Sequence, residues 1–147
     1  MTLVLVAVAA ILFSMKGQRL ILSDRDTHET YAAFPVSDGE EFSVTFVHSV
    51  NKTPVTDVYE IRDGDIWLIK TIYYDFGAGV PTETEKDETL TYGENGEMII
   101  SGMDTMVPDL IYIVGTVSDH VLETGGKEYS LRGLCGRNSH VLFSCKG

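Results

Sequence analysis

The chain has 147 residues, with 22 acidic and 11 basic side chains and a formal net charge of −11 at pH 7. This length fits one domain whose core is large enough to fold without disulfides, and it leaves no room for a second catalytic domain. The charge argues against a nucleic-acid-binding protein, because phosphates would be repelled and the basic residues are scattered singly. Hydrophobic residues make up 44% of the chain, which excludes an intrinsically disordered protein.

The first fifteen residues, Met1 to Met15, carry no charge, and Lys16 and Arg19 follow them. As a helix this run would be about 22 Å long, somewhat short of the roughly 30 Å hydrocarbon core of a bilayer. A secretory signal peptide would need a basic segment before the run and a small-residue cleavage site after it, and the sequence has neither. We therefore expect residues 1–22 to form a hydrophobic anchor helix. The alternative is a buried N-terminal helix of a cytosolic domain, and the positive-inside rule alone would also place the domain in the cytoplasm.

The remainder of the chain divides into a polar segment and a β-rich one. The stretch Ser23 to Thr30 is polar and without periodicity, so residues 23–38 are predicted to form a tether. Residues 39–147 alternate short β-rich runs with turn pairs such as Asp63-Gly64 and Asn95-Gly96. This pattern predicts an all-β domain, an antiparallel sandwich or barrel of about eight or nine short strands. The expected strands are 42–50, 55–62, 65–76, 89–92, 97–103, 110–116, 120–123, 127–133 and 140–145.

A histidine and an aspartate stand out on the first two expected strands. Every second residue from 42 to 50 is apolar except His48, so His48 faces the same side as the apolar set. The returning strand can turn either of two alternating sets of residues toward the same side. The set that begins Val55, Asp57 is apolar apart from Asp57, so burial of that face selects it. His48 then lies opposite Val55 and diagonal to Asp57, and a buried pair of this kind would be hydrogen-bonded and charged.

The His48–Asp57 pair has three interpretations. The pair can be purely structural, with the two side chains satisfying each other's buried polar groups and holding the 51–54 turn against the sheet. It can contact a ligand or partner, or it can act in general-base catalysis. The neighbouring Ser49 points to the opposite face of its strand, which makes a Ser-His catalytic pair geometrically poor.

The sequence predicts no metal or cofactor. The four histidines have no zinc-like spacing and are dispersed at His28, His48, His120 and His140. If residues 136–139 form a tight hairpin turn, Cys135 and Cys145 would be separated by about 16 Å along the ladder, too far for a disulfide. We therefore expect two free thiols.

Two short motifs carry a resemblance to a known family. The run His48-Ser49-Val50-Asn51-Lys52-Thr53-Pro54-Val55 resembles a His-Ser-Val-Glu-basic-Thr-Pro motif, and Phe76-Gly77-Ala78-Gly79-Val80-Pro81 resembles Phe-Gly-Ala-Gly-x-Pro. Both motifs are typical of a bacterial and archaeal family of small proteins of unknown function. Its members are commonly encoded beside subunits of TAXI-type TRAP transporters, tripartite carriers that take up organic acids with a solute-binding protein. Asn51 departs from the motif, because it stands where the family has a glutamate.

The second motif also has a mechanical interpretation. Gly77 and Gly79 permit backbone conformations that are closed to other residues, and Pro81 interrupts strand pairing, so a sharp loop is expected after a long strand. No lysine follows as in a phosphate-binding P-loop. The loop and the 49–54 turn together form the expected recognition surface, since loops on a rigid sheet commonly carry binding.

The resemblance implies an extracytoplasmic accessory domain that is tethered to the cell membrane through residues 1–22. We therefore predict a binding protein rather than an enzyme, with a membrane or solute-binding subunit of the transporter as its partner and no nucleic acid. The alternatives are a module that binds a small organic acid and a hydrolase that uses His48 and Asp57. The expected binding residues are His48, Ser49, Lys52, Thr53, Pro54, Asp57, Phe76, Gly77, Gly79 and Pro81.

Overall fold

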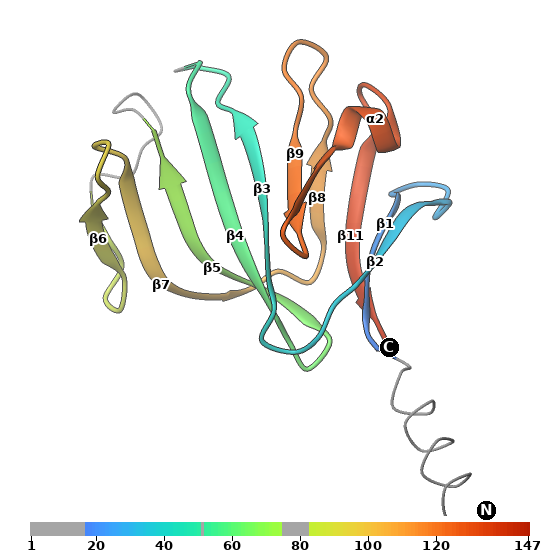
Figure 1. The fold of residues 1–147 in the computed structure, drawn as a ribbon, viewed down its shortest axis with the longest axis horizontal. Coiled ribbons are helices and arrows are strands. Elements are labelled where there is room, and N and C mark those ends of the chain that lie inside the picture. Colours follow the sequence, from blue (N-terminus) through green and yellow to red (C-terminus); the bar gives the residue numbers. More distant parts are fainter. Residues whose placement is uncertain (1–16, 51, 75–82) are drawn as a thin grey trace, which may run out of the picture.

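The computed structural model describes residues 17–50, 52–74 and 83–147. In this part of the chain eleven strands form two antiparallel sheets, accompanied by one short helix (Figure 1). The all-β antiparallel fold predicted from the sequence is therefore confirmed. Residues 1–16 of the expected anchor helix and the 76–81 loop lie outside the described residues. The expected extension of that helix to residue 22 is wrong, because Arg19–Asp24 forms strand β1. No helix within the described ranges has the length and apolar character needed to cross a membrane.

The two sheets differ in size. The smaller has the order β2-β1-β11-β8, with bounds Thr30–Pro35, Arg19–Asp24, His140–Lys146 and Leu110–Ile113. The larger has the order β10-β9-β3-β4-β5-β7-β6. Its strands are β10 (Lys127–Ser130), β9 (Val121–Thr124), β3 (Glu41–Val47), β4 (Pro54–Arg62), β5 (Asp65–Tyr73), β7 (Met98–Met106) and β6 (Thr89–Tyr92).

The predicted tether at residues 23–38 was wrong, because this segment belongs to the folded domain. β1 pairs with β11 on one side and with β2 on the other, and Leu20 and Leu22 are fully buried. The polar run between the strands is a turn in which Asp24 Oδ1 accepts hydrogen bonds from the backbone N–H groups of Asp26 and Thr27, at 2.9 and 2.8 Å. Side-chain bonding of this kind makes a short polar segment an ordered turn. The described fold therefore begins near Arg19 and not near residue 39.

The predicted strand 127–133 is also corrected at its C-terminal end. β10 stops at Ser130, and α2 follows over Leu131–Cys135. Ser130 caps this helix, since its Oγ accepts a hydrogen bond from the backbone N–H of Gly133 at 2.9 Å. Leu131 is fully buried, with Leu134 and Cys135 packed against the same core, so the apolar spacing of three and four residues is helical rather than alternating.

The inward faces of β3 and β4 are the ones that the apolar pattern predicted, but the pairing is shifted by two residues, because Phe46 and not His48 lies opposite Val55. Phe42, Val44 and Phe46 lie opposite Tyr59, Asp57 and Val55. Phe42 also stacks on Phe143 of β11, with ring centroids 6.0 Å apart, so the inward face of β3 packs against the smaller sheet. The core therefore lies between the two sheets and is built from alternate residues of each strand.

The loops of the sandwich gather at two ends, which we call proximal and distal (Figure 1). The proximal end carries residue 17, the C-terminus and the 36–40, 63–64 and 107–109 segments. The distal end carries the 48–53, 93–97 and 114–120 segments together with α2. Any segment that precedes residue 17 therefore joins the domain at the end opposite to the 48–53 turn.

Candidate functional site

A cavity of about 330 Å³ opens at the distal end between the β3–β4 turn and the β8–β9 loop. One wall comes from the turn and the other from the loop. We call it the distal pocket. Its lining residues are Val47, His48, Ser49, Lys52, Gly115, Thr116, Val117, Ser118 and His120. Three of the residues predicted from the sequence, His48, Ser49 and Lys52, therefore meet in one cavity.

The turn wall is held by backbone hydrogen bonds around His48. Its N–H donates to the Thr53 carbonyl and its carbonyl accepts from the Lys52 N–H, each at 2.9 Å. Its Nδ1 also accepts a hydrogen bond from the Val50 N–H at 3.2 Å. Lys52 has φ of 59°, a left-handed conformation that a residue with a side chain rarely adopts. These contacts reverse the chain and bring Lys52 to the pocket.

The loop wall is held by Asp119, which lies behind it. Oδ1 of this carboxylate accepts from the backbone N–H groups of His120 and Arg132, at 2.8 and 2.9 Å, and Oδ2 accepts from the Ser130 hydroxyl. The Arg132 guanidinium donates to the Gly115 carbonyl at 3.0 Å. Burial opposes ionisation of Asp119, but the hydrogen bonds from Ser130 and Arg132 outweigh it and lower the pKa. Asp119 therefore ties the loop to α2.

His120 lies at the base of the pocket, and sequence reasoning did not select it. Its Nδ1 accepts a hydrogen bond from the Gly115 N–H at 3.2 Å, and its ring stacks on Phe46 with centroids 5.7 Å apart. Burial lowers the pKa of His120 below its ordinary value, so the imidazole is neutral at pH 7 with its proton on Nε2. No spacing in the sequence points to this residue, because Phe46 and His120 become neighbours only through the fold.

The predicted pair of His48 and Asp57 does not form. Val44 and not His48 lies across from Asp57, and β3 ends at Val47, so His48 lies about 13 Å farther along the ladder. The inward faces of the two strands were predicted correctly, but the predicted pairing was wrong by two residues. The turn is longer than expected, so Phe46 takes the place opposite Val55 that was expected for His48.

Asp57 instead belongs to a buried polar cluster between the sheets. Its Oδ1 accepts a hydrogen bond from the Thr71 hydroxyl at 2.8 Å, and its Oδ2 accepts from the Tyr112 hydroxyl at 3.1 Å. The hydroxyls of Tyr112 and Tyr59 lie 2.6 Å apart. Burial raises the pKa values of both tyrosines above the ordinary one, so both stay protonated and able to donate. This cluster joins β4 and β5 of the larger sheet to β8 of the smaller one.

The Asp57 cluster predicts a pH-dependent stability. Burial raises the pKa of Asp57 above its ordinary value of 3.8, although the hydrogen bonds from Thr71 and Tyr112 act in the opposite direction. Between the unfolded and the folded pKa the native state binds more protons, so the free energy of unfolding falls as pH rises through this window. Asp57→Asn carries no titrating group. We expect its stability relative to the wild type to increase from about pH 4 to about pH 8, as measured by urea denaturation; a difference that does not change with pH would contradict this.

The other predicted residues lie beside the pocket or outside the described part. The carbonyls of Thr53 and Pro54 accept backbone hydrogen bonds from the N–H groups of His48 and Tyr74, at 2.9 and 3.3 Å. Neither residue lines the distal pocket. Phe76, Gly77, Gly79 and Pro81 fall in the range that the structure does not describe.

Metal ligands do not gather anywhere in the described ranges, where no three histidine, cysteine or acidic side chains are grouped to hold an ion. Cys135 and Cys145 are free thiols, as predicted. The hairpin assumed in that prediction is replaced by α2, which holds Cys135, while Cys145 lies in β11 opposite Leu20. Burial raises the pKa of the Cys135 thiol to about 11, so this cysteine is unreactive at neutral pH.

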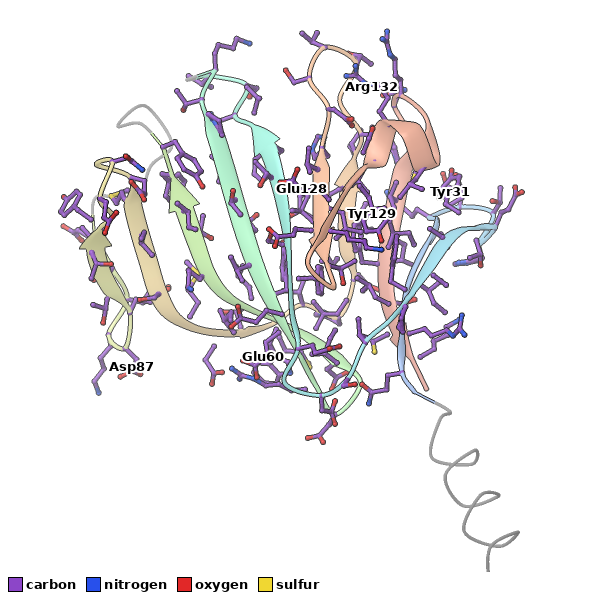
Figure 2. The ribbon with its side chains drawn as sticks, viewed as in Figure 1. Tyr31, Glu60, Asp87, Glu128, Tyr129 and Arg132 are labelled. Atoms are coloured by element: carbon purple, nitrogen blue, oxygen red, sulfur yellow. The ribbon has the colours of Figure 1, made fainter. Side chains whose placement is uncertain are left out.

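A second cavity, of about 390 Å³, lies on the outer face of the larger sheet. It is lined by the hydroxyls of Ser43, Thr45 and Thr56 and by charged side chains from β3, β5, β9 and β10. Its charged side chains are Glu41, Lys70, Glu123 and Glu128. Figure 2 shows Glu128, which lies in the edge strand β10 of this sheet. The two cavities therefore differ in charge, because the distal pocket has no acidic residue in its lining.

The fold is a β-sandwich, and the distal pocket lies among the loops at one of its ends. A family model described as a domain of unknown function, DUF1850, matches residues 42–131, and the chain belongs to that family. No curated protein and no solved structure matches the chain. The matched region runs from β3 to the first residue of α2, so it contains both walls of the distal pocket and excludes β1, β2 and β11.

Proposed function

We propose that this chain is a membrane-tethered, extracytoplasmic accessory domain that acts by binding a protein, a membrane or solute-binding subunit of a TAXI-type TRAP transporter. The observation that carries this proposal is the distribution of exposed apolar side chains. The other supports are the uncharged N-terminal run and the resemblance of the two sequence motifs.

Large apolar side chains are exposed mainly at the distal end. Of the seven such side chains in the described part of the chain, only Met106 lies elsewhere. The most exposed are Val117 at 90% and Val50 at 64%. Exposed apolar side chains that lie at one end of a domain favour an interaction surface there. We call it the distal apolar surface, and its members are Val47, Val50, Tyr74, Tyr92, Ile113 and Val117.

The exposure of Val117 is maintained by the fold. Its loop is held by the Asp119 and Arg132 hydrogen bonds, so the valine cannot turn inward without breaking them. A loop that is ordered before binding loses less conformational entropy when a partner docks. This geometry favours a surface prepared for a partner.

The proximal end has the opposite character. Its exposed side chains include Asp38, Glu40, Asp63, Asp65 and Asp109. Since residue 17 also lies there, a membrane anchor in residues 1–16 would leave the distal apolar surface pointing away from the bilayer and toward a partner (Figure 1).

Site-specific photo-crosslinking tests the partner. A photo-reactive amino acid at Val117, in cells that also produce the transporter subunits, should form a covalent adduct with one of those subunits. The same amino acid at Asp109, which is exposed at the proximal end, is the control and should not. Equal adducts from the two positions, or adducts that contain no transporter subunit, would overturn the proposed partner.

Protease accessibility tests the compartment. Protease added to intact spheroplasts should degrade the domain while a cytoplasmic marker survives. A domain that stays uncut until the membrane is lysed would place it in the cytoplasm, in agreement with the charge bias of Lys16 and Arg19 and against the proposal.

A further inference from the structure

We infer that the distal pocket binds a carboxylate that carries a short apolar group. This inference goes beyond the protein-binding function proposed above. It concerns only the cavity between the β3–β4 turn and the β8–β9 loop, and it is tested on the chain without any protein partner.

The charge of the pocket differs from that of the chain. The protein has 22 acidic residues, yet none of those in the described ranges lines this cavity. The polar side chains that line it are a lysine, two histidines and three hydroxyls. In an acidic protein, a cavity whose charged or chargeable groups are all cationic is matched to an anion.

His120 supplies one oriented donor. Because its Nδ1 accepts a hydrogen bond from the Gly115 N–H, the proton of the neutral ring is on Nε2. Among the described residues, no side chain or carbonyl accepts a hydrogen bond from this Nε2. The ring packs against both Phe46 and Tyr112, whose centroids each lie 5.7 Å from its own. The Nε2–H is therefore available to an acceptor in the pocket.

Lys52 supplies the charge. It forms no ion pair within the described part of the chain, where both ion pairs involve Arg62. The Lys52 N–H donates a hydrogen bond to the His48 carbonyl, which holds the backbone in place, so the Lys52 side chain begins at the pocket wall. A carboxylate that accepts from both Lys52 and His120 would form charge-assisted hydrogen bonds, which are stronger than neutral ones.

The other walls indicate what accompanies the carboxylate. Val47 and Val117 line the pocket from opposite sides, and both are exposed in the structure. A short branched apolar group between them would remove both valines from water. The volume of about 330 Å³ is at the lower end of the range for small-molecule sites, which favours a small acid.

Isobutyrate is a suitable probe, with isobutyramide as its uncharged isostere. Titration of the full chain in detergent micelles should give saturable changes in the amide NMR signals of Gly115 and Lys52 with isobutyrate. Isobutyramide should bind at least about tenfold more weakly, since it lacks the charge that Lys52 recognises. Equal binding of the acid and the amide would overturn the inference, as would the absence of a saturable change with both isobutyrate and the tripeptide acid described below.

Two variants locate the site. Lys52→Gln should weaken isobutyrate binding about tenfold, because a charge-assisted hydrogen bond is lost. Lys127→Gln removes an exposed lysine from the start of β10 and is the matched control, for which we expect an unchanged dissociation constant. Equal effects of the two variants would mean that binding depends on net charge and not on this pocket.

The carboxylate can come from a free acid or from the C-terminus of a protein. An N-acetylated tripeptide that ends in valine, compared with its C-terminal amide, distinguishes these sources. Binding of isobutyrate alone supports a small solute, and preferential binding of the free-acid tripeptide supports a protein C-terminus. If neither carboxylate binds better than its amide, the site does not recognise carboxylates.

Discussion

Tyr112→Phe should lower the free energy of unfolding by about 3 kcal/mol, because it leaves two buried polar groups without a partner. The Tyr112 hydroxyl donates to Asp57 Oδ2 at 3.1 Å and lies 2.6 Å from the Tyr59 hydroxyl. Tyr59 is only 3% exposed, so water does not readily replace the lost contact. Urea denaturation at neutral pH measures the effect, provided that the slope of the transition is unchanged.

Tyr31→Phe is the matched control. Its hydroxyl also donates to an aspartate, Asp24 Oδ2, at 2.9 Å, but this aspartate is only half-buried and lies at a surface turn. Water can satisfy this carboxylate after the substitution, so we expect a much smaller loss of stability. If Tyr31→Phe and Tyr112→Phe were equally destabilising, the burial of the Asp57 cluster would not be the cause.

Gly115→Ala should cost about 2–3 kcal/mol and disrupt the distal pocket, because the added methyl group has no space. A Cβ at this position would lie 2.2 Å from the backbone carbonyl oxygen of Ser118. The loop would have to open, which breaks the hydrogen bonds from the Gly115 N–H to His120 and from Arg132 to the Gly115 carbonyl. Loss of stability in urea should be accompanied by loss of the isobutyrate response.

Gly93→Ala provides the comparison for this prediction. There the added Cβ would meet side-chain atoms of Glu97, the closest at 2.1 Å. A glutamate side chain can change its rotamer, whereas the Ser118 backbone cannot move without the loop. We expect Gly93→Ala to leave the pocket intact. A Gly115→Ala protein that keeps both its stability and its ligand response would show that the 115–118 turn is more adaptable than this geometry implies.

Much of the architecture followed from local patterns. Alternation in β3 and β4 was sufficient for the correct inward faces, because a slip of one residue would have turned Phe42 and Val44 to water, but it left the pairing open to a shift of two residues. Turn pairs such as Asp63-Gly64 marked hairpins, and both residues of that pair indeed have positive φ angles. The pattern failed where a short polar run was mistaken for a tether, since the pairing of β1 with β11 joins the two ends of the chain and has no local signature.

The candidate site could be predicted only in part. His48, Ser49 and Lys52 were found because they lie together in one turn and one motif. His120 and the Asp119–Arg132 contacts come from segments far along the chain, and no spacing rule connects them to the turn. The expected contact between His48 and Asp57 failed because turn length, which periodicity does not specify, decides where a strand ends.

By itself, the sequence determined the strand class, the inward faces of β3 and β4, and one wall of the distal pocket. These features depend on side-chain alternation and on residues that are close in the chain. Only the tertiary structure decided that Asp57 bonds to Thr71 and Tyr112, that β1 and β2 join the domain, and that His120 completes the pocket. Such contacts depend on how two sheets stack, and a buried polar group takes whichever partner that packing brings within hydrogen-bond distance.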